Sequence, residues 1–133
     1  MANPNIVNVT SIYGNTAYVT PGSTSVSTAW TYNGSTSLTG LTPATNSVNK
    51  IDSIIATNTT GSTANASVAI SNNATYGSGT AYYIASTIPV PANSSLVITD
   101  KSTSFYLTEN QSLGVISGTS SALTFVASFE VIS

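Results

Sequence analysis

Four carboxylates are the side chains whose chemistry could serve catalysis: Asp52, Asp100, Glu109 and Glu130. The chain has no histidine and no cysteine, which excludes a base that titrates near neutral pH and a thiolate nucleophile. Two carboxylates that flank a glycosidic bond form the one catalytic scheme still open. Because Glu130 falls on the outward face of a final strand and Asp100 stands beside Lys101 in a turn, we interpret both as solvated surface charges. We expect no enzyme activity.

A calcium site is the other chemistry that these carboxylates could support. Asp100 or Glu109, together with turn carbonyls, would supply the oxygen ligands that a hard cation prefers. No clustered acidic loop surrounds either residue. A thiolate zinc site and a disulfide are both impossible without cysteine. We therefore expect no metal and no cofactor.

Aromatic side chains supply a second kind of candidate site, a flat surface on which sugar rings could stack. The candidates are Trp30, Tyr32, Tyr76, Tyr82 and Tyr83. Tyrosine also packs well in strands and in protein interfaces. For Trp30 we favour ordinary packing over the end of a sheet, and glycan binding stays open as the alternative function.

Charge is scarce, because Asp, Glu, Lys and Arg together make up 5% of the residues and the net charge is -2. With Lys50 and Lys101 as its only basic side chains, the protein cannot neutralise a row of phosphates, which excludes nucleic-acid binding and a polybasic membrane patch. Free-standing β proteins protect their edge strands with lysine or proline. Two lysines give little such protection, so we expect a subunit of a permanent, symmetric assembly.

The elements that must position these residues are short strands. Apolar and polar residues alternate most clearly over residues 64–71 and 123–131, a period of two that indicates half-buried strands. Pro89 and Pro91 lack a ladder donor and mark a sheet edge or corner. The predicted strands cover residues 6–19, as a hairpin that turns at Gly14-Asn15, and residues 48–57, 64–71, 81–88, 96–99, 105–108, 113–117 and 123–131.

These short strands, about 8–12 residues apart and without a helical period, predict an all-β fold. We expect one antiparallel β-sandwich or jelly-roll-like domain of about eight or nine strands over residues 1–133. Residues 23–47 are rich in serine, threonine and glycine and are interpreted as a loop or a hairpin. No apolar run reaches the length of about 20 residues that a membrane span needs. Residues 1–4 lack the pattern of a signal peptide, so we expect synthesis in the cytoplasm without secretion.

Residues 48–57 are apolar on both faces, which predicts a central strand or one that a neighbouring subunit covers. This strand and the aromatic pair in the undecided region are the expected partner surfaces. The candidate interface residues are Trp30, Tyr32, Ile51, Ile54 and Ile55.

Several stretches of the chain resemble small virion proteins of tailed bacteriophages, notably those that infect marine cyanobacteria. These stretches are NPNIVNVT at residues 3–10, KIDSIIATNTT at 50–60, IPVPANSSLVITDKSTSFYLTENQSLGV at 88–115 and FEVIS at 129–133. The resemblance covers the first ten residues and most of the chain from residue 48 onward.

The resemblance implies a β-sandwich structural protein of the virion with no catalytic residues. It favours a capsid decoration or cement subunit on the capsid surface, with the major capsid protein or other virion proteins as partners and a trimer as the oligomeric state. A neck, tail or fibre component that binds a receptor or a glycan is the alternative.

Overall fold

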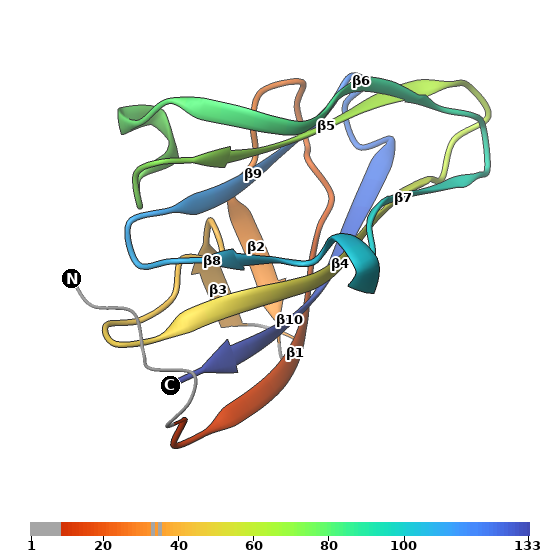
Figure 1. Ribbon diagram of the computed structural model, residues 1–133. Helices are drawn as coiled ribbons and strands as arrows, with labels where there is room; N and C mark the ends of the chain where they lie inside the picture. Colours follow the sequence, from red (N-terminus) through yellow and green to blue (C-terminus); the bar gives the residue numbers. More distant parts are fainter. Residues whose placement is uncertain (1–8, 33, 35) are drawn as a thin grey trace.

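The computed structural model describes residues 9–32, 34 and 36–133. Two antiparallel sheets pack as an all-β sandwich, as the alternation predicted (Figure 1). The larger sheet contains β1 (Ile12–Val19), β2 (Ala29–Tyr32), β3 (Thr36–Thr39), β4 (Val48–Asn58), β7 (Ser95–Thr99), β8 (Phe105–Leu107) and β10 (Leu123–Ile132). The smaller sheet contains β5 (Ala64–Ser71), β6 (Ala81–Val90) and β9 (Ser112–Ser117).

The strand order of the larger sheet is β3-β2-β1-β10-β4-β7, and β8 pairs with β4 beside β7. The smaller sheet has the order β6-β5-β9. Two short 3-10 turns, η1 (Tyr76–Ser78) and η2 (Lys101–Thr103), interrupt the loops after β5 and β7. β10 and β4 are therefore central strands, and β6 is an edge strand at the top of Figure 1.

One hydrophobic core joins the two sheets. Leu123, Phe125 and Ala127 of β10 are fully buried, as their period of two predicted, and Val68 and Val115 meet them from the smaller sheet. Trp30 of β2 is also fully buried, and its indole Nε1 donates a hydrogen bond of 3.1 Å to the carbonyl oxygen of Leu113 in β9. This bond ties the larger sheet to the smaller one.

The expected hairpin at Gly14-Asn15 is wrong. β1 runs without a break through both residues and pairs with β10 in eight consecutive positions, from Ile12 opposite Ile132 to Val19 opposite Phe125. The local preference of Gly-Asn for a turn is overridden because this ladder satisfies the backbone of the whole strand. The first arm of that hairpin was predicted over residues 6–13; residues 6–8 lie outside the described residues, and β1 begins at Ile12.

The undecided region contains the hairpin that one of the two interpretations allowed. β2 and β3 pair from Ala29 opposite Thr39 to Tyr32 opposite Thr36, and Gly34 in the turn has a φ of 80°. Only glycine adopts this left-handed conformation without a steric cost. The structured part of the chain thus has ten strands, and not eight or nine, because one predicted hairpin is a single strand and this hairpin adds two.

The two prolines mark the edge that they predicted. Pro89 lies in edge strand β6 opposite Asn65, and Pro91 follows directly after the strand ends. The register between β5 and β6 shifts twice, around Ser86-Thr87 and at Ile84. Thr87 has a φ of 49°, and its backbone N–H donates to the Ser67 hydroxyl at 2.8 Å. In the described residues, no helix is long and apolar enough to span a bilayer.

Candidate interaction surfaces

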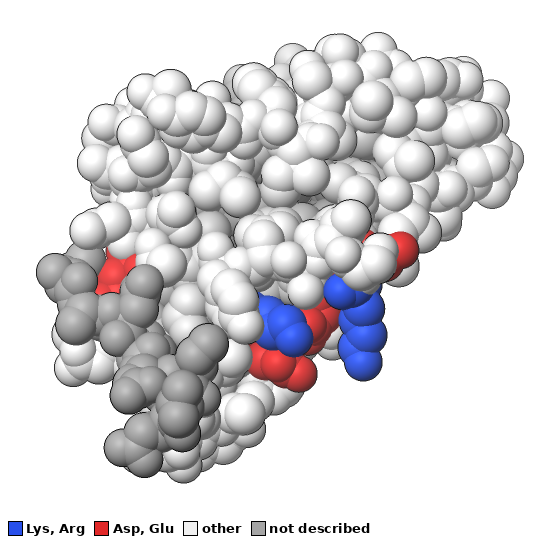
Figure 2. Space-filling view, in the orientation of Figure 1, with Lys and Arg blue, Asp and Glu red and all other residues white. Residues whose placement is uncertain are grey.

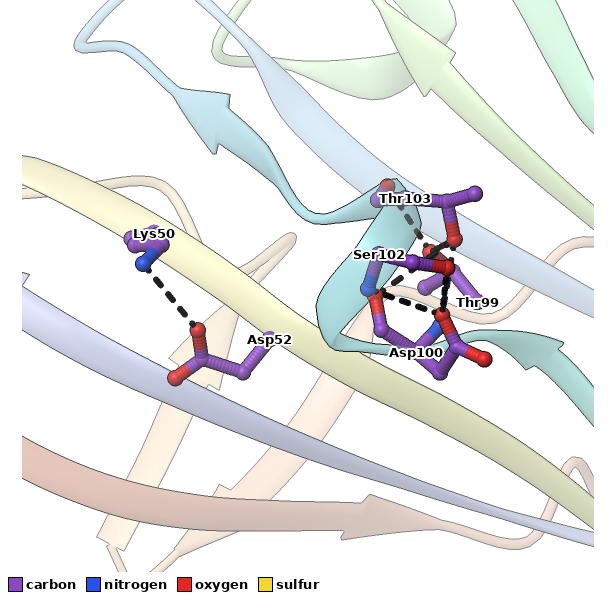
Figure 3. Close-up of polar contacts among 6 residues, drawn as sticks. All are labelled: Lys50, Asp52, Thr99, Asp100, Ser102 and Thr103. Carbon is purple, nitrogen blue, oxygen red and sulfur yellow. Dashed lines mark hydrogen bonds and ion pairs between the residues drawn. The ribbon is translucent and has the colours of Figure 1, made fainter.

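Asp52 lies at a β-bulge in the middle of β4. The register with β10 pairs Ser53 with Ser128 and then Ile51 with Phe129, so Asp52 has no partner in the ladder. Lys50 Nζ lies 3.7 Å from Asp52 Oδ1 (Figure 3), an ion pair that is too long for a hydrogen bond. Asp52 Oδ1 is buried and has no hydrogen-bond partner. Lys50 therefore supplies its electrostatic compensation.

Asp100 is a local cap of η2. Its Oδ1 accepts hydrogen bonds from the backbone N–H of Ser102 at 2.9 Å and from the Ser102 hydroxyl at 2.6 Å (Figure 3). The Ser102 hydroxyl, followed by the Ser102 backbone N–H, lowers the pKa of the Asp100 carboxyl from its ordinary value of 3.8. Turn formation accounts for this carboxylate, as the sequence suggested.

The two glutamates have different surroundings, since Glu109 lies in the turn between β8 and β9 and Glu130 lies in β10. Glu109 is buried, and its Oε1 accepts a hydrogen bond of 2.6 Å from the backbone N–H of Asn46. Glu130 is half-buried in β10, directly opposite Lys50 of β4 and Gly14 of β1. Within the described residues, no three acidic side chains come together in a way that could hold a metal ion.

The five aromatic residues do not form one stacking surface. Trp30 is fully buried, which excludes it from such a surface and agrees with the core packing that we favoured. The ring of Tyr32 packs edge-on against Phe129, with centroids 6.4 Å apart. Tyr82 and Tyr83 lie in β6 of the other sheet. The predicted surface is thus split between the two sheets.

The candidate interface residues differ in how deeply they are buried. Ile51 and Ile54 are fully buried inside the sandwich, as is Trp30, so these three side chains are core residues and leave no surface for a partner. The inward face of β4 belongs to the core, whereas its outward face is mixed, because Lys50 and Thr57 lie on it beside Ile55. Tyr32 and Ile55 are half-buried, and Ile55 faces outward.

Edge strand β6 exposes the largest apolar side chains of the smaller sheet. Tyr82 is 61% exposed and Tyr83 is 55% exposed, and Ile84 and Ile88 are exposed as well. Tyr82 and Tyr83 are neighbours in the strand, so both of its faces are open. No residue from 53 to 99 is charged. β6 is therefore an uncharged edge with apolar side chains on both sides.

Tyr76 of η1 packs against β9, the outer strand of the smaller sheet opposite to β6. An added Cβ at Gly114 of β9 would lie 2.7 Å from the Tyr76 ring and 2.7 Å from Val26 Cγ2, so the ring rests on the glycine. Burial raises the pKa of the Tyr76 phenol above its ordinary value of 10.0, and nearby Tyr83 raises it further. Gly114 thus makes room for a tyrosine cluster at one end of the smaller sheet.

The outward face of the larger sheet is a second surface, here called the outer face. The strand register arranges it in rows that cross β1, β10, β4 and either β7 or β8. The apolar row contains Tyr18, Val126, Ile55 and Val97, and the hydroxyl row contains Thr20, Thr124, Thr57 and Ser95. The charged row contains Gly14, Glu130, Lys50 and Tyr106.

The hydroxyl row is bonded in pairs along its length. Thr20 Oγ1 and Thr124 Oγ1 are 3.0 Å apart, and Thr57 Oγ1 and Ser95 Oγ are 2.9 Å apart. Figure 2 shows that blue and red atoms gather on the lower part of the molecule, whereas the upper part, which contains β5 and β6, is white. Charge is therefore concentrated on the side of the larger sheet.

A small hollow opens at one end of the sandwich. It has a volume of about 140 Å³ and a mostly apolar lining of Tyr32, Leu38, Thr42, Pro43, Ala44, Asn49 and Val131. Asn49 Nδ2 donates to the carbonyl oxygen of Leu41 at 2.8 Å, while its Oδ1 has no hydrogen-bond partner. That oxygen is enclosed, so a molecule in the hollow has no access to it without a rearrangement.

Sequence reasoning offered Tyr82 and Tyr83 for sugar stacking, but it missed β6 as a partner surface and missed the rows of the outer face. An uncharged segment with exposed tyrosines and a proline near its end was the available signal for an exposed edge. The rows depend on pairing between distant strands, for which a single sequence carries no local signal. No protein-family model, curated protein or solved structure matches this chain.

Proposed function

We propose that this protein is a non-enzymatic structural subunit of a tailed-phage virion, most simply a capsid decoration or cement subunit. In this proposal edge strand β6 binds the major capsid shell. The phage context comes from the sequence resemblance described above, and the surface comes from the arrangement of exposed side chains.

The exposure of β6 is the observation that supports this function best. A free edge strand presents unpaired backbone groups, and natural β proteins protect such an edge with charge, proline or β-bulges. β6 has Pro89 and two register shifts but no charged residue, and Tyr82, Tyr83, Ile84 and Ile88 are exposed along it. Aromatic and aliphatic side chains of this kind are typical of the centre of protein interfaces. An apolar strand or groove of the shell is the partner that fits.

The carboxylates support a structural role as well. Asp52 is compensated by Lys50, Asp100 caps a turn, and Glu109 holds a backbone N–H. Each of these three carboxylates makes a contact that stabilises the fold. We therefore assign the function to a binding surface and not to a catalytic group.

Binding to particles tests the proposal. Tyr82→Lys places a charge on β6, and Tyr13→Lys makes the same change on β1 at a tyrosine of similar exposure, 64% against 61%. We expect the Tyr82→Lys protein to lose co-sedimentation with capsids that lack the native protein, whereas the Tyr13→Lys protein binds like the wild type. Equal binding of both variants, with both folds intact by circular dichroism, would exclude β6 as the capsid surface.

Glycan binding by a tail or fibre component remains the second candidate, because Tyr82 and Tyr83 are exposed rings on opposite faces of β6. Trp30 plays no part in it, since the side chain is buried. The candidate predicts binding to a glycan array that Tyr82→Ala and Tyr83→Ala abolish. A wild-type protein that binds capsids and no glycan would remove it.

A further inference from the structure

The outer face has a symmetry in its residue types. Along the charged row, Lys50 of β4 lies next to Glu130 of β10, and Tyr106 at one end balances Gly14 at the other. A line that runs parallel to the strands between β4 and β10 divides every row into two halves. In the charged row, Lys50 and Tyr106 on one side of this line are matched by the opposite charge of Glu130 and the small Gly14 on the other side.

We propose that the outer face binds a second copy of this chain across a two-fold axis that runs along that line. The rotation brings β4 over β10 of the second copy, and β7 and β8 over β1 of the second copy. A two-fold contact of this kind is isologous, so every pairing occurs twice.

Charge complementarity is the first argument for this arrangement. Lys50 of each copy faces Glu130 of the second copy and also pairs with Asp52 of its own chain, so each lysine lies between two carboxylates close to the axis. No ion pair joins Glu130 to the described residues of its own chain. A two-fold axis at right angles to the strands would instead place Glu130 over the hydroxyl row, where this carboxylate lacks a counterion.

Shape complementarity is the second argument. Tyr106 is 48% exposed at one end of the charged row. The rotation places it over Gly14 of the second copy, where an added Cβ would meet no atom within 4 Å. The glycine thus leaves a gap of the kind that a projecting ring fills. Gly14 has no positive φ, so its own backbone does not require a glycine.

The apolar row completes the contact. Ile55 faces Val126 of the second copy, and Val97, which is 57% exposed, faces Tyr18 of the second copy. Between the charged row and the apolar row lies one more row, which contains Thr16, Ser128 and Ser53. With it, four strands about 4.8 Å apart and four rows about 6.8 Å apart cover about 500 Å² per copy. The total of about 1,000 Å² is near the lower limit for a specific interface, so we expect a dissociation constant in the micromolar range.

Sheet twist limits how many of the pairings persist. Two sheets that pack face to face cross at about 30°, which shifts the outermost residues sideways. Pairings near the axis are shifted least. The long, flexible side chain of Lys50 spans the offset in the charged row, and the hydroxyl row is polar enough to remain hydrated at the rim.

Complementary substitutions at Gly14 and Tyr106 test the arrangement in the purified protein alone. Gly14→Leu fills the gap that receives Tyr106, and Tyr106→Ala removes the ring. We expect sedimentation velocity to show a species of twice 13.5 kDa for the wild type and at least tenfold weaker association for each variant. A mixture of the two variants should form a heterodimer. In that heterodimer the introduced leucine of one chain faces the introduced alanine of the other, while the original Tyr106–Gly14 contact forms once.

Charge reversal provides a second test of the same geometry. Glu130→Lys places a lysine opposite Lys50 of the second copy, and we expect it to weaken association at least tenfold. Ala74→Lys adds a charge in the exposed loop that follows β5 of the smaller sheet and should leave association unchanged. A wild-type monomer at 100 μM, a trimer, or a mixture of Gly14→Leu and Tyr106→Ala that stays monomeric would each overturn the proposal.

Failure of this proposal is distinguishable from failure of the capsid role. The experiment uses no capsid, and none of its substitutions lies in β6. A monomer that still binds capsids through Tyr82 would remove only the two-fold pairing.

Discussion

The outer face and edge strand β6 differ in their use of charge. The outer face holds Lys50, Asp52 and Glu130, half of the six charged side chains of the chain, whereas β6 has none. Alternating charges along a row restrict which partner fits and in which orientation. The uncharged edge with exposed tyrosines accepts an apolar partner, while Pro89 and the two register shifts of β6 limit its pairing with other strands. One small domain thus presents two surfaces with different selectivity.

The largest effect is expected from a substitution that weakens the contact between the two sheets. Trp30→Ala removes a fully buried ring and the Nε1 hydrogen bond to Leu113 that joins them. We expect the free energy of unfolding to fall by about 3–5 kcal/mol, as for other large-to-small changes in a core. Urea denaturation followed by circular dichroism measures this loss. Trp30→Phe, which keeps most of the volume, is the control and should cost clearly less.

Two glycines, one in each sheet, differ in the space beside them and are therefore expected to respond differently to substitution by alanine. Gly114→Ala places a Cβ 2.7 Å from the Tyr76 ring, so we expect a loss of about 1–3 kcal/mol from overpacking. Gly14→Ala places a Cβ in open space, and we expect it to be neutral or to stabilise the strand by about 0.5 kcal/mol. Thermal unfolding of both variants checks the difference. Equal melting temperatures would mean that Tyr76 does not rest on Gly114.

Removal of one lysine tests whether charge stabilises the larger sheet. Lys50→Met leaves the buried Asp52 Oδ1 without its counterion, and we expect a loss of about 1 kcal/mol, the lower end of the cost for an unpaired buried group. Lys101→Met removes an exposed lysine and serves as the matched control. If both variants unfold at the same denaturant concentration, the Lys50–Asp52 pair contributes nothing to stability.

The smallest expected effect concerns Asp100. Because its pKa is lowered in the folded protein, Asp100 stabilises the fold above its ordinary pKa of 3.8, and this contribution is lost as the pH falls through the lowered value. Ser102→Ala removes the hydroxyl donor, so the pKa should move back toward 3.8. Carboxyl chemical shifts in an NMR titration measure this change. An unchanged pKa would mean that the shift comes from the other hydrogen bonds of Asp100, with the Ser102 backbone N–H and with Thr103.

The alternating strands were the predictable part of the fold. In β5 and β10 the apolar residues recur at every second position, and Pro89 and Pro91 marked the edge beside them. These signals are local, since they depend on side-chain periodicity and on a missing backbone donor. Residues 48–57 were predicted to form a central strand or one that a neighbouring subunit covers, and β4 is central in the larger sheet.

Long-range pairing explains what the sequence did not predict. Gly14-Asn15 lies inside a strand because β10 pairs with it, and Asp52 lies at a bulge because the register shifts between distant strands. Trp30 and Ile51 were offered as partner residues although the sandwich buries them. The burial of a residue depends on which strand covers it, and that information appears only once the sheets are assembled.

The position of this chain in an intact virion tests the capsid role most directly. We predict that cryo-electron microscopy of the phage particle shows many copies on the capsid surface, with Tyr82 and Tyr83 of β6 against the major capsid protein. Particles in which the chain occurs in a few copies at the tail, or in which β6 faces solvent, would contradict this prediction.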